Sequence, residues 1–296
     1  MHLSYRSGTQ WTALVFVAGM LCGHVLAAGN DRVVIVPVAN MYSSPTQDAD
    51  LLSQAILGSD VEVLETEKDW IKARTPDRYS GWIPVVLLRP QDASHLYGFQ
   101  GRVVQVQSLF ANLYRETDVT THQPVITVPF ESRLEVVAEG TGGDVGWLRV
   151  LLPDGRTAWV QGSDVIRDPK PLTIPESITL AKRFLGLPYL WGGRSSYGYD
   201  CSGFTQMLVR SRGINMPRDA DLQAAWDGLR VIDRKHLQPG DLLFFGGGPD
   251  NITHTAMYIG KGEIIHATTH GNPVIQISRL KDQPWTRILV ACRRVK

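Results

Sequence analysis

The chain has 296 residues, of which 43% are hydrophobic, so it can bury sizeable cores, and one domain per ~150 residues predicts about two domains. Its 30 Lys and Arg residues nearly balance 29 Asp and Glu, which excludes a nucleic-acid binder that works through bulk positive charge. A charged fraction of only 20% also argues against long disordered segments.

Residues 1–28 have the layout of a secretory signal peptide. Arg6 precedes a mostly apolar run over residues 11–26, and the small residues Ala27 and Ala28 follow. We therefore predict cleavage near Ala27 or Ala28 and export to the periplasm or the extracellular space. The alternative is an uncleaved anchor, since a run of ~16 to 18 apolar residues can just span a bilayer. Membrane contact is expected only in that case.

Residues 31–168 read as short alternating runs separated by turn residues, which is typical of small β-barrels or sandwiches. Several motifs recur in the same order, which indicates a duplicated unit, and we assign the two copies to residues 31–91 and 100–168. The repeated motifs are Asn-x-Tyr at 40–42 and 112–114, Val/Leu-Glu-Val at 61–63 and 134–136, and pairs of Trp at 70 and 82 and at 147 and 159.

Both copies resemble bacterial SH3 (SH3b) domains in their Asn-x-Tyr segment and their late Gly/Ala-Trp-Val/Ile segment. The resemblance implies ligand or substrate binding, whereas a packed spacer is the simpler interpretation, and we expect the four Trp side chains to be core residues. Tyr79 is different because it lies in the polar turn Asp-Arg-Tyr-Ser-Gly, where packing does not require a large aromatic side chain. Tyr79 is therefore a candidate binding residue.

Three prolines in residues 169–175 predict a stiff, extended linker. Beyond it we expect helices over residues 177–185, around Phe204, Met207 and Leu208, and over residues 219–226. Strand-like runs follow from Asp241 onward. Helices followed by strands predict an α+β domain with an antiparallel sheet over residues 176–296.

Cys201 is the candidate nucleophile, because it lies between a Gly-rich loop and an apolar helix. Asp200 can cap that helix, which would place Cys201 in the first turn, where the helix dipole favours the reactive thiolate. A thiol nucleophile needs a base. His254 and His266 lie in strands joined by residues 260–262, and a hairpin in which paired positions sum to 522 makes the two imidazoles diagonal neighbours on one face.

A zinc site built from Cys201, His254 and His266 is the chemical alternative to nucleophilic catalysis. Cys201 has no second Cys at Cys-x-x-Cys spacing, and the chain has no His-Glu-x-x-His motif. We therefore expect neither a metal nor a cofactor.

The segments Asp-Cys-Ser-Gly-Phe at 200–204 and His-Thr-Ala-Met-Tyr-Ile-Gly-Lys-Gly-Glu-Ile-Ile-His-Ala at 254–267 resemble the NlpC/P60 cysteine peptidases. The resemblance implies a papain-like α+β catalytic domain preceded by two SH3b barrels. It also implies hydrolysis of the bond between γ-D-glutamate and a diamino acid, meso-diaminopimelate or Lys, in peptidoglycan stem peptides. By this resemblance Cys201 is the nucleophile, His254 the general base and acid, and His266 the orienting group, while Tyr189 and backbone N–H groups hold the oxyanion.

Tandem SH3b units together with Tyr-Leu-Trp-Gly-Gly at 189–193 resemble a narrower group, the dipeptidyl-peptidase VI-like enzymes. That resemblance implies cleavage of stem peptides with a free N-terminal L-Ala. It also implies that the first SH3b unit closes one end of the substrate cleft and recognises the ammonium group there. Ala220 departs from the pattern, which has a small hydroxyl residue at that position. The candidate substrate-binding residues are Asp50, Tyr79, Trp191, Asp200, Ser202, Arg218 and Asp219.

Alternatives of other kinds remain open at this point. The chain could be a broader cell-wall hydrolase that its SH3b units anchor to the wall, or a non-catalytic wall-binding protein. The same three residues could also support acyl transfer on a substrate unrelated to peptidoglycan.

Overall fold

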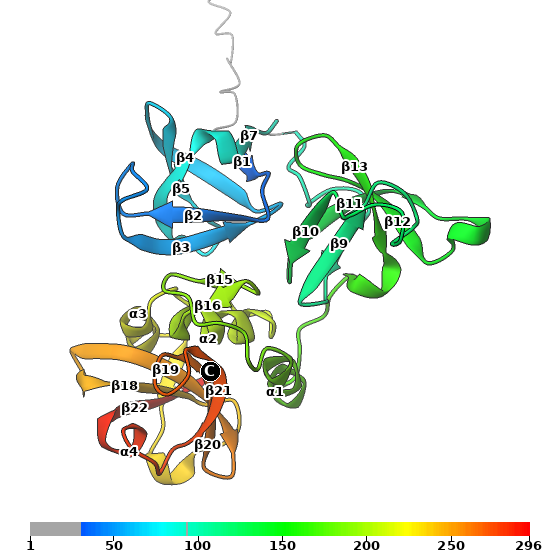
Figure 1. Ribbon diagram of the computed structural model, residues 1–296. Helices are drawn as coiled ribbons and strands as arrows, with labels where there is room; N and C mark the ends of the chain where they lie inside the picture. The colour runs from blue at the N-terminus through cyan, green and yellow to red at the C-terminus, as the bar shows by residue number, and fades with distance from the viewer. Residues whose placement is uncertain (1–30, 93) are drawn as a thin grey trace, which may run out of the picture.

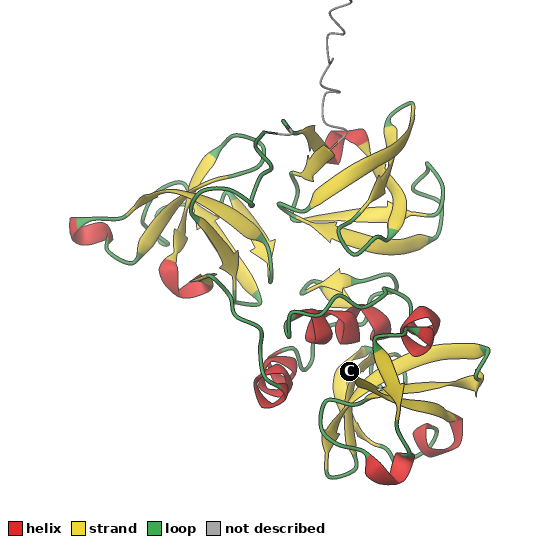
Figure 2. Ribbon diagram, turned by 180° about the vertical axis from the view of Figure 1, so that it is seen from behind, coloured by secondary structure: helices red, strands yellow, loops and turns green. Residues whose placement is uncertain are grey.

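The computed structural model describes residues 31–92 and 94–296, so the predicted leader lies outside the described residues. Three bodies follow one another along the chain: a first β-unit, a second β-unit and a C-terminal α+β domain (Figures 1 and 2). Within the described ranges, no helix has the length and apolar character needed to cross a membrane.

The first β-unit is an antiparallel sheet with the strand order β3-β2-β6-β5-β4-β1-β7. Alternate residues of β2 and β5 point into its core, which contains Ala39, Met41, Ile71 and Ala73. Its elements are β1 (Asp31–Val34), β2 (Val38–Tyr42), β3 (Leu51–Ile56), β4 (Asp60–Glu67), β5 (Trp70–Arg74), β6 (Ser80–Pro84), the short helix η1 (Val85–Leu87) and β7 (Leu88–Pro90).

The second β-unit has the strand order β10-β9-β13-β12-β11-β8-β14, which matches the first unit strand for strand. The repeated motifs occupy equivalent strands: Asn-x-Tyr lies in β2 and β9, and the two Trp positions lie in β5 and β6 and in β12 and β13. Its elements are β8 (Val103–Val106), β9 (Phe110–Tyr114), β10 (Ile126–Pro129), β11 (Arg133–Glu139), η2 (Gly142–Asp144), β12 (Trp147–Leu151), β13 (Thr157–Gln161), η3 (Gly162–Asp164) and β14 (Val165–Arg167).

The expectation that all four repeated Trp side chains are core residues is wrong for three of them. Trp82 is buried, whereas Trp70, Trp147 and Trp159 are partly exposed. Trp70 and Trp147 begin equivalent strands, and each lines a surface hollow, of about 480 Å³ in the first unit and about 220 Å³ in the second. Both strands are paired on two sides, so these Trp rings lie at the end of their sheets, beside a hollow at the protein surface.

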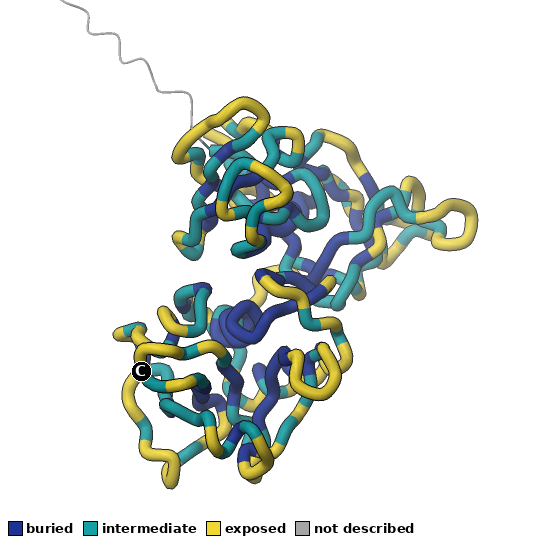
Figure 3. Tube along the Cα trace, turned by 60° about the vertical axis from the view of Figure 1, so that its left-hand side comes forward, coloured by how far each residue is buried: buried dark blue, intermediate teal, exposed yellow. Residues whose placement is uncertain are grey.

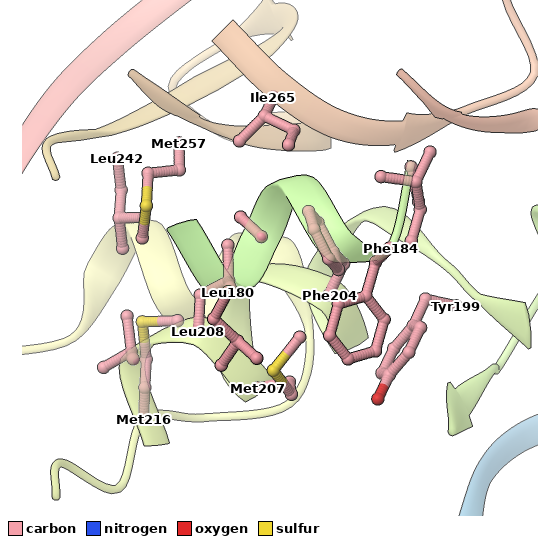
Figure 4. Packing of buried hydrophobic residues seen from close by; sticks show 14 of the residues in the cluster. Leu180, Phe184, Tyr199, Phe204, Met207, Leu208, Met216, Leu242, Met257 and Ile265 are labelled. Atoms are coloured by element: carbon pink, nitrogen blue, oxygen red, sulfur yellow. The ribbon is translucent and has the colours of Figure 1, made fainter. Parts of the chain in front are cut away.

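The C-terminal domain has a six-stranded antiparallel sheet with the order β17-β22-β18-β19-β20-β21, and α2 packs on one of its faces. Phe204 of α2 joins a cluster of aromatic rings with Phe184 and Tyr199 (Figure 4). The elements are α1 (Ile174–Arg183), β15 (Arg194–Ser195), β16 (Gly198–Tyr199), α2 (Cys201–Arg210), α3 (Ala220–Ala225), β17 (Leu229–Val231), η4 (Arg234–His236), β18 (Leu242–Gly248), β19 (Asn251–Gly260), β20 (Glu263–Thr268), β21 (Val274–Arg279), α4 (Trp285–Ile288) and β22 (Leu289–Val295).

The predicted linker at residues 169–175 is too long at its C-terminal end, because α1 already begins at Ile174. Thr173 and Glu176 form a reciprocal capping box, in which the side chain of each accepts a hydrogen bond from the backbone N–H of the other. Pro175 lies in the first helical turn, where its missing N–H costs no hydrogen bond. The last proline of the run therefore belongs to the first turn of α1 and not to the linker.

Both β-units lie on the side of the C-terminal domain that carries α2 (Figures 1 and 3), and polar side-chain contacts fix each unit to this helix. In the first unit, Asp77 Oδ2 accepts from Gln206 Nε2 at 3.0 Å. In the second unit, Glu131 binds the Arg210 guanidinium with both carboxylate oxygens, at 3.1 and 2.5 Å. Phe130 of the second unit also belongs to the core of the C-terminal domain. The helix that begins at Cys201 is thus held from two sides.

Candidate active site

Cys201 is the first residue of α2, in the first helical turn as the sequence predicted, and its side chain is buried. Asp200 precedes it with extended backbone angles and accepts a hydrogen bond from the N–H of Gly203 at 2.7 Å, which is the expected N-cap. The Gly-rich segment before Asp200 lets the backbone at Gly193 pack closely against the backbone at Gly198, since a Cβ on Gly193 would lie 2.4 Å from the carbonyl oxygen of Gly198. The nucleophile is therefore held at the start of a capped, buried helix.

Arg218 is the centre of a hydrogen-bond network behind Cys201, and its side chain is almost completely buried. Its guanidinium donates to both carboxylate oxygens of Asp200 at 2.9 and 2.6 Å and to Ser202 Oγ at 2.8 Å. It also donates to the carbonyl oxygen of Gly193 at 3.2 Å and to Ser53 Oγ of the first β-unit at 3.1 Å. These contacts use every N–H group of the guanidinium, so Arg218 supports the Cys201 turn and links it to the first β-unit.

The hairpin that carries the two histidines has the predicted register near the active site. Met257 pairs with Ile265, and these positions sum to 522. Closer to the turn a bulge shifts the pairing, so Gly260 lies opposite Glu263 and the predicted pairing of Ile259 with Glu263 is wrong. The Gly-rich turn permits the shift, since Gly260 has a positive φ of 99°.

The two imidazoles meet on one face of the sheet, as predicted. His254 Nε2 is 2.8 Å from His266 Nδ1, and His266 Nε2 is 3.0 Å from Ser278 Oγ. The ring of Trp285 stacks on His254 at a centroid distance of 5.2 Å and meets His266 edge-on at 4.6 Å. With Nε2 of His254 bound to His266, Nδ1 is the ring nitrogen left to accept a proton from the thiol.

The thiol of Cys201 lies against β19, since the backbone N–H of Thr255, the residue after His254, reaches it. This N–H and that of Ser202 act to lower the pKa of the thiol. Burial nevertheless dominates and, with the charge of Asp200, raises the pKa of Cys201 to about 12. The thiolate that we expected at a helix start is therefore not favoured in the free protein, because burial raises the pKa of Cys201.

The base responds to burial in the opposite direction. His254 retains some solvent exposure, yet the protein packed around it lowers its pKa to about 3. Charging the thiol or the imidazole separately is thus unfavourable over most of the pH range. Moving the proton from sulfur to nitrogen leaves the net charge of the pair at zero, so this transfer is the route to a thiolate that the site permits.

His266 makes the stability of the protein depend on pH, because burial and His254 hold its pKa well below 6.5. Below pH 6.5 the unfolded chain binds a proton that the native imidazole does not, so the free energy of unfolding falls as the pH falls. Between pH 6.5 and 4.5, we expect the free energy of unfolding of the His266→Gln variant to depend less steeply on pH, by up to ~1.4 kcal/mol per pH unit. Urea denaturation across this range measures the slope, and equal slopes in both proteins would contradict the prediction.

The remaining predicted site residues lie around Cys201 and along the boundary with the first β-unit. The phenol of Tyr189 has a raised pKa because of burial and the adjacent Cys201. Tyr79 Oη of the first unit donates to Asp219 Oδ2 across the boundary at 3.1 Å. Trp191 is 70% exposed, and Asp50 is exposed in the loop just before β3.

Sequence reasoning missed three residues of this site. Ser278 and Ser53 are single hydroxyl groups in strands, and only strand pairing and domain docking bring them to His266 and Arg218. Trp285 follows a run of polar residues, and its placement over the histidines depends on the fold of residues 280–288. The alternation of polar and apolar residues in β21 was the one sequence signal that could have indicated Ser278.

Comparisons with known proteins agree with this geometry. The NlpC/P60 family profile matches residues 186–294, and the profile of the bacterial dipeptidyl-peptidase Sh3 domain matches residues 41–86, within the first β-unit. The chain is 35% identical over 236 residues to the gamma-D-glutamyl-L-lysine dipeptidyl-peptidase of Bacillus cereus, covering 73% of this chain and 67% of the relative. It is 29% identical over 260 residues to dipeptidyl-peptidase 6 of Lysinibacillus sphaericus, covering 86% and 93% of the two chains.

The fold also matches a solved structure over nearly its whole length. A crystal structure of an NlpC/P60 family protein from Bacillus cereus superposes with a TM-score of 0.77 and 28% identity, covering 90% of this chain and 99% of the other. The α+β domain with its Cys–His–His group, the profile match and the long relatives agree. The chain therefore belongs to the NlpC/P60 family of cysteine peptidases and carries a bacterial SH3 domain as its first β-unit.

Proposed function

We propose that this protein hydrolyses the bond between γ-D-glutamate and a diamino acid, meso-diaminopimelate or Lys, in peptidoglycan stem peptides that begin with a free L-Ala. The names of its relatives support the reaction. The observation that carries the preference for a free amine is the contact of Tyr79 with Asp219, which places a hydroxyl and a carboxylate where the first β-unit meets the C-terminal domain. A hydroxyl beside a carboxylate suits an ammonium group, because both can accept its hydrogen bonds.

The proposed mechanism uses the relay of Cys201, His254 and His266. His254 Nδ1 takes the thiol proton, and the sulfur attacks the γ-carbonyl carbon of D-glutamate. Backbone N–H groups at the start of α2, together with Tyr189, hold the developing oxyanion. His254 then gives the proton to the departing amine, and water hydrolyses the thioester. His266 accepts the Nε2 hydrogen of His254 and so stabilises the imidazolium formed in the first step.

Asp219 is the carboxylate that we assign to the substrate ammonium. Asp200 is also a candidate from the sequence, but both of its carboxylate oxygens accept hydrogen bonds from Arg218. Asp219 occupies the N-cap position of α3, yet its side chain makes no capping hydrogen bond, and Tyr79 binds one of its oxygens. Ser202, Trp191 and Asp50 are proposed to shape the wall around this group.

A comparison of two substrates tests the proposal. We expect L-Ala-γ-D-Glu-diaminopimelate to be cleaved at least ~10-fold faster, in kcat/KM, than the same peptide capped with a muramoyl group, because the cap removes the charge and adds bulk. Tyr79→Phe and Asp219→Asn should reduce this ratio mainly through KM for the free peptide. Mass spectrometry of the products measures the rates, and equal rates on both substrates would exclude recognition of the free amine.

The second β-unit is proposed to be a further SH3b domain that spans residues 100–168 and has a structural role. Its strand order equals that of the first unit, and its residues Phe130 and Glu131 are used to attach it to the C-terminal domain. This attachment supports a fixed spacer over a mobile wall anchor. Export through the leader at residues 1–28 is part of the proposal, since peptidoglycan lies outside the cytoplasmic membrane.

A further inference from the structure

The hydrogen-bonded chain of the active site continues beyond His266 to a hydroxyl group. Ser278 lies in β21 opposite Ile264 of β20, two residues from His266 and on the same face of the sheet. Its Oγ is 3.0 Å from His266 Nε2, while His266 Nδ1 is 2.8 Å from His254 Nε2. His266 is fully buried. His254 and Ser278 are thus the hydrogen-bond partners of its two ring nitrogens.

We propose that Ser278 is a positioning residue that holds His266 in the tautomer that the relay requires. This inference rests on the proposed roles of Cys201 and His254. If His254 is to accept the thiol proton at Nδ1, its neutral ring must carry hydrogen on Nε2 and donate to His266 Nδ1. His266 then carries its own hydrogen on Nε2, and Ser278 Oγ must accept it.

The reverse direction of donation stops the relay. If the Ser278 hydroxyl donates to Nε2, His266 carries hydrogen on Nδ1 and donates to His254 Nε2. The hydrogen of His254 then lies on Nδ1, toward the thiol, where it blocks proton transfer. Once His254 is an imidazolium, both of its nitrogens donate, so only the direction toward Ser278 is possible. An acceptor at position 278 therefore stabilises the charged state of the pair more than the neutral state.

The surroundings of His266 explain why the hydroxyl is needed. Trp285 is 4% exposed and lies against both imidazoles, so it covers the relay on that side. A buried N–H group without a partner is unfavourable, and loss of the hydroxyl would move the neutral ring of His266 toward the unproductive tautomer. An alanine at position 278 would leave space for a water molecule, whereas valine fills the volume of threonine without a hydroxyl.

Ser278→Thr and Ser278→Val are therefore the matched variants for the test. We expect the Val variant to lose about tenfold or more in kcat/KM on L-Ala-γ-D-Glu-diaminopimelate, and the Thr variant to stay within about threefold of the parent protein. The acid limb of the pH profile of kcat/KM should move to lower pH in the Val variant, because the His254 imidazolium is less stabilised. Nitrogen-15 NMR of the imidazole rings should show hydrogen on Nε2 of His266 in the parent and Thr proteins, and on Nδ1 in the Val variant.

The outcomes separate this inference from the proposed function. Equal rates, equal acid limbs and the same His266 tautomer in the Thr and Val variants would overturn the role of Ser278. Full activity of a Cys201→Ala variant would instead overturn the proposed function itself. Thermal unfolding of each variant shows whether a lost rate comes from an unfolded protein, and the NMR tautomer decides the question independently of activity.

Discussion

Replacement of Cys201 by Ala is expected to lower kcat/KM for L-Ala-γ-D-Glu-diaminopimelate by on the order of 10⁴-fold or more, because no other group can form the thioester. The change removes one sulfur atom from a buried position at the start of α2, where Asp200 still caps the helix. We therefore expect the variant to stay folded, with a melting temperature close to that of the parent. Steady-state assays with detection of the released dipeptide measure the loss.

Cys292 provides the matched control, because it and Cys201 are the two free cysteines among the described residues and both are buried. It lies in β22 and packs in the cluster that contains Phe245 and Trp285. Cys292→Ala should cost some stability and leave the chemical step unchanged. Comparable losses of turnover in both variants would show that the Cys201 effect comes from damaged packing and would contradict its role as nucleophile.

Replacement of Arg218 by Met is expected to destabilise the protein by ~3 to 5 kcal/mol, because it leaves the buried carboxylate of Asp200 without its cation. Arg218 also joins the C-terminal domain to Ser53 of the first β-unit, so the boundary beside Tyr79 and Asp219 should loosen. The pKa of Cys201 should rise further, since the charge of Arg218 lowers it in the parent protein. Urea denaturation and the pH dependence of kcat/KM measure the two effects.

The double variant Asp200→Asn with Arg218→Met is the control for this interpretation. Removing both charges should restore part of the lost stability, because no unpaired carboxylate is left in the interior. Arg230→Met changes an exposed arginine of β17 and should alter stability by less than ~0.5 kcal/mol. If Arg218→Met lowers the free energy of unfolding by less than ~1 kcal/mol, the ion pair between Arg218 and Asp200 does not stabilise the turn that carries Cys201.

The sequence by itself determined the class of each part and the identity of the reacting groups. Alternating strands and repeated motifs predicted two β-units, and the Asp-Cys-Ser-Gly segment with two histidines on one hairpin predicted the relay. These features are local, because N-caps, strand alternation and hairpin register depend on neighbouring residues. The register near His254 follows from the same local rule, and only the bulge at Gly260 changed it closer to the turn.

The tertiary structure alone decided how these groups are supported and charged. Ser53, Tyr79 and Glu131 lie far from α2 in sequence and reach it or its neighbours only because the β-units dock against the C-terminal domain. Desolvation also depends on everything packed around a group, so the raised pKa of Cys201 could not be read from its place at a helix start. The spacing of residues along the chain identifies the reacting groups, whereas burial and long-range contacts determine their protonation states and their hydrogen-bond partners.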